Sequence, residues 1–155
     1  MGNTQKLKTR VEDEVREWLE RKFKKSFISK RLAIGTKSKK EAATREFDAV
    51  SDDGSIVASI KSNSWTTSGG NIPSAKVNIF YTELYFFGLL KDKPKKLFIF
   101  TNKATLEGFK NTSDGKRPKD VELIHVPLAK NTKRVVARVN RKASQEMRLI
   151  KADGK

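Results

Sequence analysis

Cysteine is absent from the sequence, and histidine occurs only once, as His125. Disulfide bonds and zinc sites built from cysteine and histidine are therefore excluded. The sequence also lacks a glycine-rich nucleotide fingerprint and any Ser-His-Asp or Cys-His arrangement suited to acyl transfer. The single histidine lies within the apolar stretch VELIHVPL, and we interpret it as a structural residue.

Acidic residues are scarce relative to basic ones, with 18 Asp and Glu against 34 Lys and Arg and a net charge of +16. This balance favours a polyanionic partner, of which nucleic acid is the most common. Long apolar runs are also missing, because stretches such as FYTELYFFGLL are short and interrupted by polar residues, so we expect no membrane-spanning segment. The start, MGNTQKLKTR, does not resemble a signal peptide, and we expect a cytoplasmic protein.

The 155 residues fit one compact domain over 1–155, with the basic segment 130–155 as a helical extension. Apolar residues recur at helical spacing from Leu7 to Phe23, which predicts an amphipathic helix that Thr4 could cap. For segment 24–40 we expect a loop with a short strand or turn. We expect further helices at 77–90, 105–111 and 130–151, and strands at 46–50, 55–61, 95–101 and 121–126. This alternation predicts an α/β fold with a mixed sheet.

The stretch FDAVSDDGSIVASIK reads as two strands joined by a turn, because Asp53-Gly54 is a strong hairpin signal. Side chains alternate across a strand, so Ser59 and Lys61 should share one face, with Ala58 and Ile60 on the other. By the same rule, we expect Asp48 to share a face with Glu46 and Val50.

The hairpin should bring Asp48 close to Lys61. An acid and an ammonium group placed in this way could bind a divalent metal and orient a water molecule. They could equally form a cross-strand salt bridge on a solvated face. The hairpin alone leaves both interpretations open.

A helix with a glutamate, an aspartate before a turn, and a strand ending in lysine together resemble the PD-(D/E)xK nuclease superfamily. Within it, the order of elements is most similar to the archaeal Holliday-junction resolvases and their restriction-enzyme-like relatives, over roughly residues 11–101. The resemblance implies a restriction-endonuclease-like mixed central sheet flanked by helices. It places the family's glutamate, aspartate and lysine on Glu12, Asp48 and Lys61, whereas Ser59 stands where the family has an acid.

The resemblance also implies a role for each residue. Asp48 and Glu12, helped by the carbonyl of Ile60, would hold Mg²⁺ or Mn²⁺ through hard oxygen ligands. Lys61 would position the attacking water or neutralise charge that develops on the phosphate. Ser59 would line the site as a weaker ligand than a carboxylate.

Two other acids could replace the missing one. Glu83 is the first candidate, because a charged residue within an aromatic run is costly to bury without a function. Some restriction enzymes of the superfamily likewise take an acid from a following helix. Glu46 is the second candidate, since it shares the expected face of Asp48. Glu83 could instead lie on an exposed helix edge or pair with a lysine.

Contacts to nucleic acid are expected from hydroxyl, aromatic and basic residues around this site. The loop SNSWTTSGGN offers hydroxyls and backbone amides, and its tryptophan could stack on a base or pack against the domain. The aromatic helix 77–90 could support a homodimer. The candidate nucleic-acid-binding residues are Lys37, Lys39, Lys40, Ser62, Trp65 and Lys76.

Two functions of different class remain open from the sequence. The first is a metal-dependent DNA endonuclease acting on duplex or branched DNA. The second is a catalytically degenerate protein that binds DNA or RNA on the same fold. They differ in their acids, since a nuclease needs at least two carboxylates within reach of Lys61.

Overall fold

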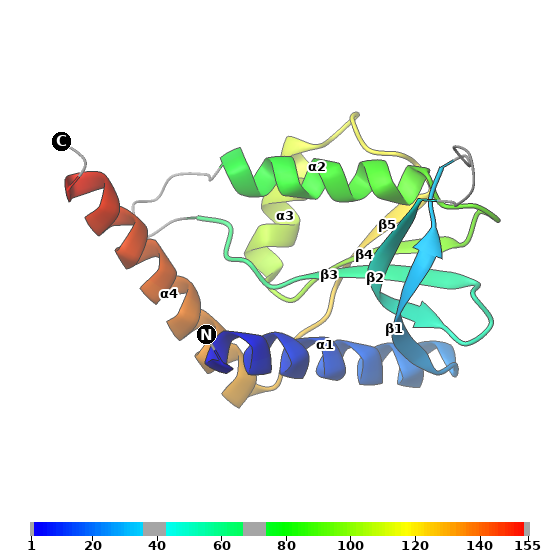
Figure 1. The fold of residues 1–155 in the computed structure, drawn as a ribbon, viewed down its shortest axis with the longest axis horizontal. Helices are drawn as coiled ribbons and strands as arrows, with labels where there is room; N and C mark the ends of the chain where they lie inside the picture. Colours follow the sequence, from blue (N-terminus) through cyan, green and yellow to red (C-terminus); the bar gives the residue numbers. More distant parts are fainter. Residues whose placement is uncertain (1, 36–42, 67–73, 154–155) are drawn as a thin grey trace.

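The computed structural model describes residues 2–35, 43–66 and 74–153. Four helices and five strands follow one another along this part of the chain (Figure 1). Their bounds are α1 Gly2–Phe23, β1 Phe27–Ala33, β2 Thr44–Ser51, β3 Ile56–Lys61, α2 Ser74–Gly88, β4 Lys95–Phe100, α3 Lys103–Thr112, β5 Val121–His125 and α4 Lys130–Asp153.

The five strands form one mixed sheet in the order β1-β2-β3-β4-β5. β1 pairs antiparallel with β2, and β2 antiparallel with β3 through the turn at Asp52–Gly54. β3, β4 and β5 run parallel, because α2 and α3 carry the chain back between them. The predicted α/β class with a mixed sheet flanked by helices is therefore confirmed.

Helices cover both faces of the sheet. α2 and α3 lie on one face, and α1 with the first part of α4 lies on the other, while the rest of α4 extends away from the sheet (Figure 1). The helical stripe of Val11, Val15 and Leu19 is fully buried against the second face. The prediction that Thr4 caps this helix is wrong, since α1 begins two residues earlier.

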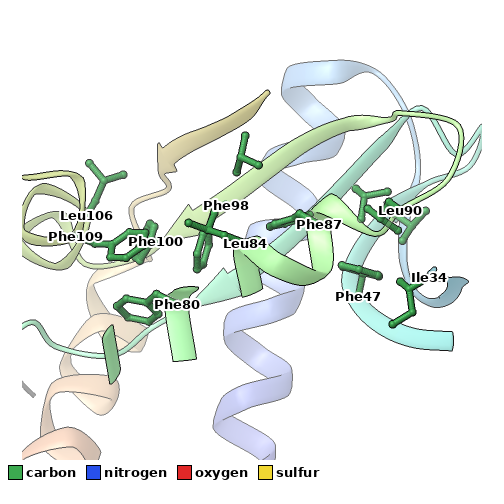
Figure 2. Packing of buried hydrophobic residues seen from close by; sticks show 13 residues of the cluster. Ile34, Phe47, Phe80, Leu84, Phe87, Leu90, Phe98, Phe100, Leu106 and Phe109 are labelled. Atoms are coloured by element: carbon green, nitrogen blue, oxygen red, sulfur yellow. The ribbon is translucent and has the colours of Figure 1, made fainter. Parts of the chain in front are cut away.

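An aromatic cluster fills the space between the sheet and the α2–α3 layer. Phe80 of α2 makes edge-to-face contacts with Phe98, Phe100 and Phe109, at centroid distances of 5.2–5.9 Å. Figure 2 shows these rings in one continuous group that extends through Phe87 to the far end of the sheet. Such pairs add about 0.5–1.5 kcal/mol each beyond their burial, so this layer fixes α2 firmly over β3 and β4.

Residues 24–35, the described part of the segment 24–40, are where the fold departs most from expectation. Where a loop with a short strand or turn was predicted, β1 forms a seven-residue edge strand. Phe27 is its one fully buried side chain, and the next four residues are exposed, so no alternation of apolar and polar residues marks the strand in the sequence. Backbone pairing with β2 holds it in place.

Within the described residues, no helix is both long and apolar enough to cross a bilayer.

The chain leaving β3 is fixed by a close contact with α3. A Cβ atom at Gly108 would lie 2.2–2.5 Å from three atoms of the Trp65 indole, a separation that no real contact allows. Only glycine therefore lets the indole pack against this helix. Trp65 is partly buried here against the aromatic core. Of the two expectations for this side chain, this is packing against the domain.

Replacing Gly108 with alanine should lower the thermal midpoint, because the methyl group must displace the indole. Overpacking typically costs about 1–3 kcal/mol, and each kcal/mol shifts the midpoint by roughly 2–4 °C for a chain of this size. Gly88→Ala is the matched control, since nothing lies within 4 Å of its added Cβ and alanine favours a helix. A Gly108→Ala midpoint equal to that of Gly88→Ala, measured by circular dichroism, would contradict the contact.

Candidate active site

A β-bulge in β2 sets the position of Asp48. Ile28 of β1 pairs with Val50 and Lys30 pairs with Phe47, so Asp48 and Ala49 together face the single residue between them. The extra residue reverses the alternation of side chains. Phe47 and Val50 consequently both pack in the α2-side core, and the prediction that Asp48 shares a face with Val50 is wrong.

The carboxylate of Asp48 takes the place of a backbone partner for β3. β2 and β3 pair at Ala49–Ala58 and Val50–Val57, and further along the Ile60 N–H donates to Asp48 Oδ2 at 2.8 Å. A side chain longer than a backbone carbonyl thus bridges the two strands where they diverge. The bulge and this hydrogen bond together open the sheet between β2 and β3.

A cavity of about 550 Å³ lies at this divergence. We call it the acidic cavity, because four carboxylates line it from elements far apart in the sequence, although the basic residues Lys8, Arg31, Arg45 and Lys61 line it as well. Its lining includes Glu12 of α1, Glu46 and Asp48 of β2, Lys61 of β3 and Glu83 of α2. All the acids and the lysine singled out from the sequence therefore face one space.

Glu83 is hydrogen-bonded to Ser59, the residue at the position where the resemblance implies an acid. The Ser59 hydroxyl donates to one oxygen of Glu83, and both residues are buried. Arg45 Nη2 donates to the other oxygen at 2.6 Å, and Lys61 Nζ lies 3.7 Å from the same atom. Two cations and a hydroxyl therefore compensate this buried carboxylate.

Arg45 was not identified from the sequence, although it lines the acidic cavity and donates a hydrogen bond to Glu83. Its guanidinium stacks on Phe86 at 4.1 Å from the ring centroid and lines the acidic cavity beside Glu83. Within the described part of the chain, its buried Nε has no hydrogen-bond partner. In the sequence, only the position of Arg45 two residues before Phe47 could have indicated its role.

Arg16 was also missed, and it anchors α1 to the site. Its Nη1 donates to the backbone carbonyl of Asp48 at 2.7 Å and lies 3.8 Å from Glu12 Oε2. The spacing of four residues places Glu12 and Arg16 on one side of the helix. Arg16 thus holds the glutamate of α1 over the aspartate of β2.

Burial raises the pKa of both central carboxyls. For Glu12, loss of solvent is the main cause, and the neighbouring charge of Asp48 raises its pKa further. For Asp48, burial outweighs the Ile60 N–H and the Lys61 ammonium, which act in the opposite direction. Asp48 thus raises the pKa of Glu12, and Glu83 raises the pKa of Asp48, so a bound cation would relieve the repulsion among these acids.

The donor atoms suit a hard divalent cation such as Mg²⁺ or Mn²⁺. Lys61 O accepts from Thr101 N on the β4 side, so the Ile60 carbonyl, one residue earlier, points toward β2 together with its N–H. Asp48, Glu12 and this carbonyl therefore supply two carboxylates and one backbone oxygen. Within the described ranges, no three Asp, Glu, His or Cys side chains converge closely enough to hold a metal. The Glu83 oxygens are engaged with Ser59, Arg45 and Lys61.

The structure describes only some of the residues that were expected to contact nucleic acid. Lys37, Lys39 and Lys40 lie outside the described residues. Lys76 Nζ donates to the Ser64 carbonyl at 3.3 Å, and burial lowers the pKa of this lysine. Of the described candidates, Ser62, Trp65 and Lys76 do not line the acidic cavity. Ser62 lines a second cavity instead, and so does His125, which was expected to be structural.

Comparisons with protein-family models, with curated proteins and with solved structures give no match to this chain. The resemblance to the PD-(D/E)xK superfamily therefore stays a prediction from the residues.

Asp48→Asn should raise the thermal midpoint at neutral pH in metal-free buffer. A carboxyl whose pKa is raised in the folded state keeps its proton at pH values at which the unfolded chain has already lost it. Stability therefore falls as pH rises through the interval between the two pKa values. Asparagine can still accept from the Ile60 N–H and carries no buried charge. The gain should shrink toward about pH 4, where the carboxyl also takes up protons in the unfolded chain.

Asp53→Asn is the control of opposite sign. Lys25 and nearby hydroxyls lower the pKa of Asp53, so its stabilising effect is present above the ordinary aspartate pKa and is lost as pH falls. This variant should therefore lower the midpoint at neutral pH. A lower midpoint for Asp48→Asn as well, measured by thermal denaturation, would show that Asp48 does not carry a destabilising charge.

Proposed function

We propose that this chain is a metal-dependent endonuclease that hydrolyses phosphodiester bonds in DNA by chemistry of the PD-(D/E)xK type. The observation that carries the proposal is the acidic cavity. There, an α1 glutamate, a β2 aspartate, a β3 lysine and an α2 glutamate line one space of about 550 Å³ on a chain with a net charge of +16. Four acids interleaved with four cations in one cavity of a basic protein suit a site where carboxylates hold a cation and basic residues hold a polyanion.

Each residue has a role that follows from its surroundings. Asp48 and Glu12, with the Ile60 carbonyl, would hold Mg²⁺ or Mn²⁺, which would polarise the phosphate and lower the pKa of a bound water. Asp48 is fixed by the Ile60 N–H, and Glu12 is held over it by Arg16. The carboxylates therefore reach the cavity from a rigid strand and a rigid helix.

Lys61 supplies the positive charge on the other side of the cavity. Its ammonium lies 3.7 Å from Glu83, whose other oxygen is held by Ser59. Glu83 thus orients Lys61, and Ser59 orients Glu83. A lysine held in this way would stabilise negative charge that develops on the phosphate in the transition state.

One observation favours the alternative of a binding protein with a degenerate site. Arg45 donates to Glu83 at 2.6 Å, so this acid is neutralised and cannot add a third carboxylate without exchanging partners. A protein of this kind would bind DNA or RNA through its basic surface and leave it intact. A homodimer also stays a prediction, for which the exposed Ile79 and Tyr85 of α2 offer apolar surface.

Cleavage of supercoiled plasmid and of a four-way junction, with Mg²⁺, Mn²⁺ or EDTA, tests the proposal. We expect cutting that requires metal and that falls about 100- to 1000-fold in Lys61→Ala, the loss typical of removing one group that stabilises transition-state charge. Lys110→Ala is the matched control, since it removes the same charge at an exposed position of α3. It should cut like the wild type.

Two results would overturn the proposal. Cutting that survives in Lys61→Ala would come from another site or a contaminant. Salt-sensitive binding without cutting in any metal would instead support the binding protein.

A further inference from the structure

A second cavity, of about 600 Å³, lies at the carboxyl ends of the three parallel strands. Ser62 directly after β3, Thr101 directly after β4 and His125 at the end of β5 line it, and α4 closes one side. In Figure 1 the chain leaving β3 runs toward α4, and Asn140 of that helix donates to the Ser62 carbonyl at 3.3 Å. In open α/β sheets, the carboxyl ends of parallel strands are the usual place for a ligand.

This cavity differs in charge from the acidic cavity, where four cations accompany the four acids. Lys103, Lys133 and Arg141 line it, and no Asp or Glu is among its lining residues in the part of the chain that the structure describes. We call it the basic cavity. The contrast lies between neighbours in sequence, because Lys61 lines the acidic cavity and Ser62 lines the basic one. A cavity with cations and without carboxylates suits an anion.

The wall formed by the loop after β3 is held in place by side chains from three helices. Besides the bond from Asn140, Thr105 Oγ1 donates to the Asn63 carbonyl at 2.6 Å, and Lys76 Nζ donates to the Ser64 carbonyl at 3.3 Å. The Trp65 indole, packed against Gly108, fixes the next residue. The hydroxyls of this loop therefore line the cavity from a constrained backbone.

The lining is apolar as well as basic. Leu128, Val136 and Ala137 contribute to the same cavity as the three cations and the hydroxyls. A phosphate alone would use only the cations. A nucleotide would use both, with its phosphate on the basic residues and its sugar or base on the apolar ones.

We propose that the basic cavity binds one nucleotide of the nucleic-acid strand whose phosphodiester lies at Lys61. This inference rests on the proposed function and adds a second contact for the same strand. The backbone from Lys61 to Ser64 spans at most about 11 Å. That reach corresponds to about three nucleotides at 3.4 Å each along a strand. The substrate would therefore be gripped a few nucleotides from the bond that is cut.

The test is binding of a labelled single-stranded oligonucleotide of about eight nucleotides in EDTA, followed by fluorescence anisotropy. The double variant Lys133→Ala and Arg141→Ala should weaken binding about tenfold, as expected for the loss of about 1.4 kcal/mol. The slope of log affinity against log salt should fall by roughly 0.7 for each phosphate contact removed.

The matched control is the double variant Arg134→Ala and Arg138→Ala. It removes the same charge from exposed positions of the same helix, and neither residue lines the basic cavity. Its affinity should stay within about twofold of the wild type, well below a tenfold effect. Equal weakening by both double variants would reduce the effect to the general charge of α4 and overturn the proposal.

A single substitution that adds a carboxylate gives an independent check. Ala137→Glu places an acid at an exposed position in the basic cavity, whereas Asn131→Glu adds one to the same helix outside it. Only Ala137→Glu should weaken binding beyond the loss of charge, while circular dichroism shows both variants folded. If a deoxynucleoside monophosphate displaces the oligonucleotide at equal affinity, the cavity serves free nucleotides, and the assignment to a strand is wrong.

The outcome is separate from that of the nuclease proposal. Binding is measured without metal, so it does not depend on the catalytic cation, and Lys110→Ala, at an exposed position outside both cavities, should bind the oligonucleotide nearly as the wild type does. If plasmid cleavage fails while these binding results hold, the chain is a binding protein and the basic cavity stands. If cleavage succeeds and the cavity variants bind normally, the second contact alone is refuted.

Discussion

The hydrogen bond from the Ile60 backbone N–H to the Asp48 carboxylate is the interaction on which the acidic cavity depends. It uses a donor that would otherwise continue the pairing of β2 with β3, and it holds an acid where the strands separate. The bulge at Asp48–Ala49 makes this possible, because it reverses the side-chain alternation of β2 without unfolding its buried half. The same residue thereby ends the antiparallel pairing and begins the site.

The two cavities differ in charge. On a chain with a net charge of +16, four acids and four cations line the acidic cavity, whereas three cations line the basic cavity. Lys61 and Ser62 join the two regions at the end of β3. An incoming strand would meet phosphate-binding residues next to a site that attracts a cation, and both are needed to hold a polyanion against carboxylates.

Local patterns predicted most of the fold. The Asp-Gly turn, the helical stripe of α1 and the apolar runs of β4 and β5 each follow from neighbouring residues, and all are confirmed. β1 escaped prediction because its stability comes from pairing at a sheet edge and from one buried phenylalanine. The bulge escaped for a related reason, since an extra residue in β2 shows only against the register of its partner.

The candidate site was predicted to the extent that residue type reveals chemistry. Glu83 stood out as a charge within an aromatic helix, and it does contact Ser59. Arg45 and Arg16 gave no comparable signal, because lysine and arginine are abundant throughout this chain, and the single histidine, His125, was interpreted as structural because it lies in an apolar stretch. Their positions depend on which strands and helices meet, and only the three-dimensional structure supplies that.

Titration of the isotopically labelled protein with Mn²⁺, followed by NMR, tests the central claim most directly, because the paramagnetic ion broadens the signals of nearby amides. If Asp48, Glu12 and the Ile60 carbonyl hold the cation, the amides of Ile60 and Lys61 should broaden first and saturably, and Asp48→Asn should abolish the effect. Broadening centred on the Asp52–Asp53 turn, or unchanged in the variant, would contradict the account.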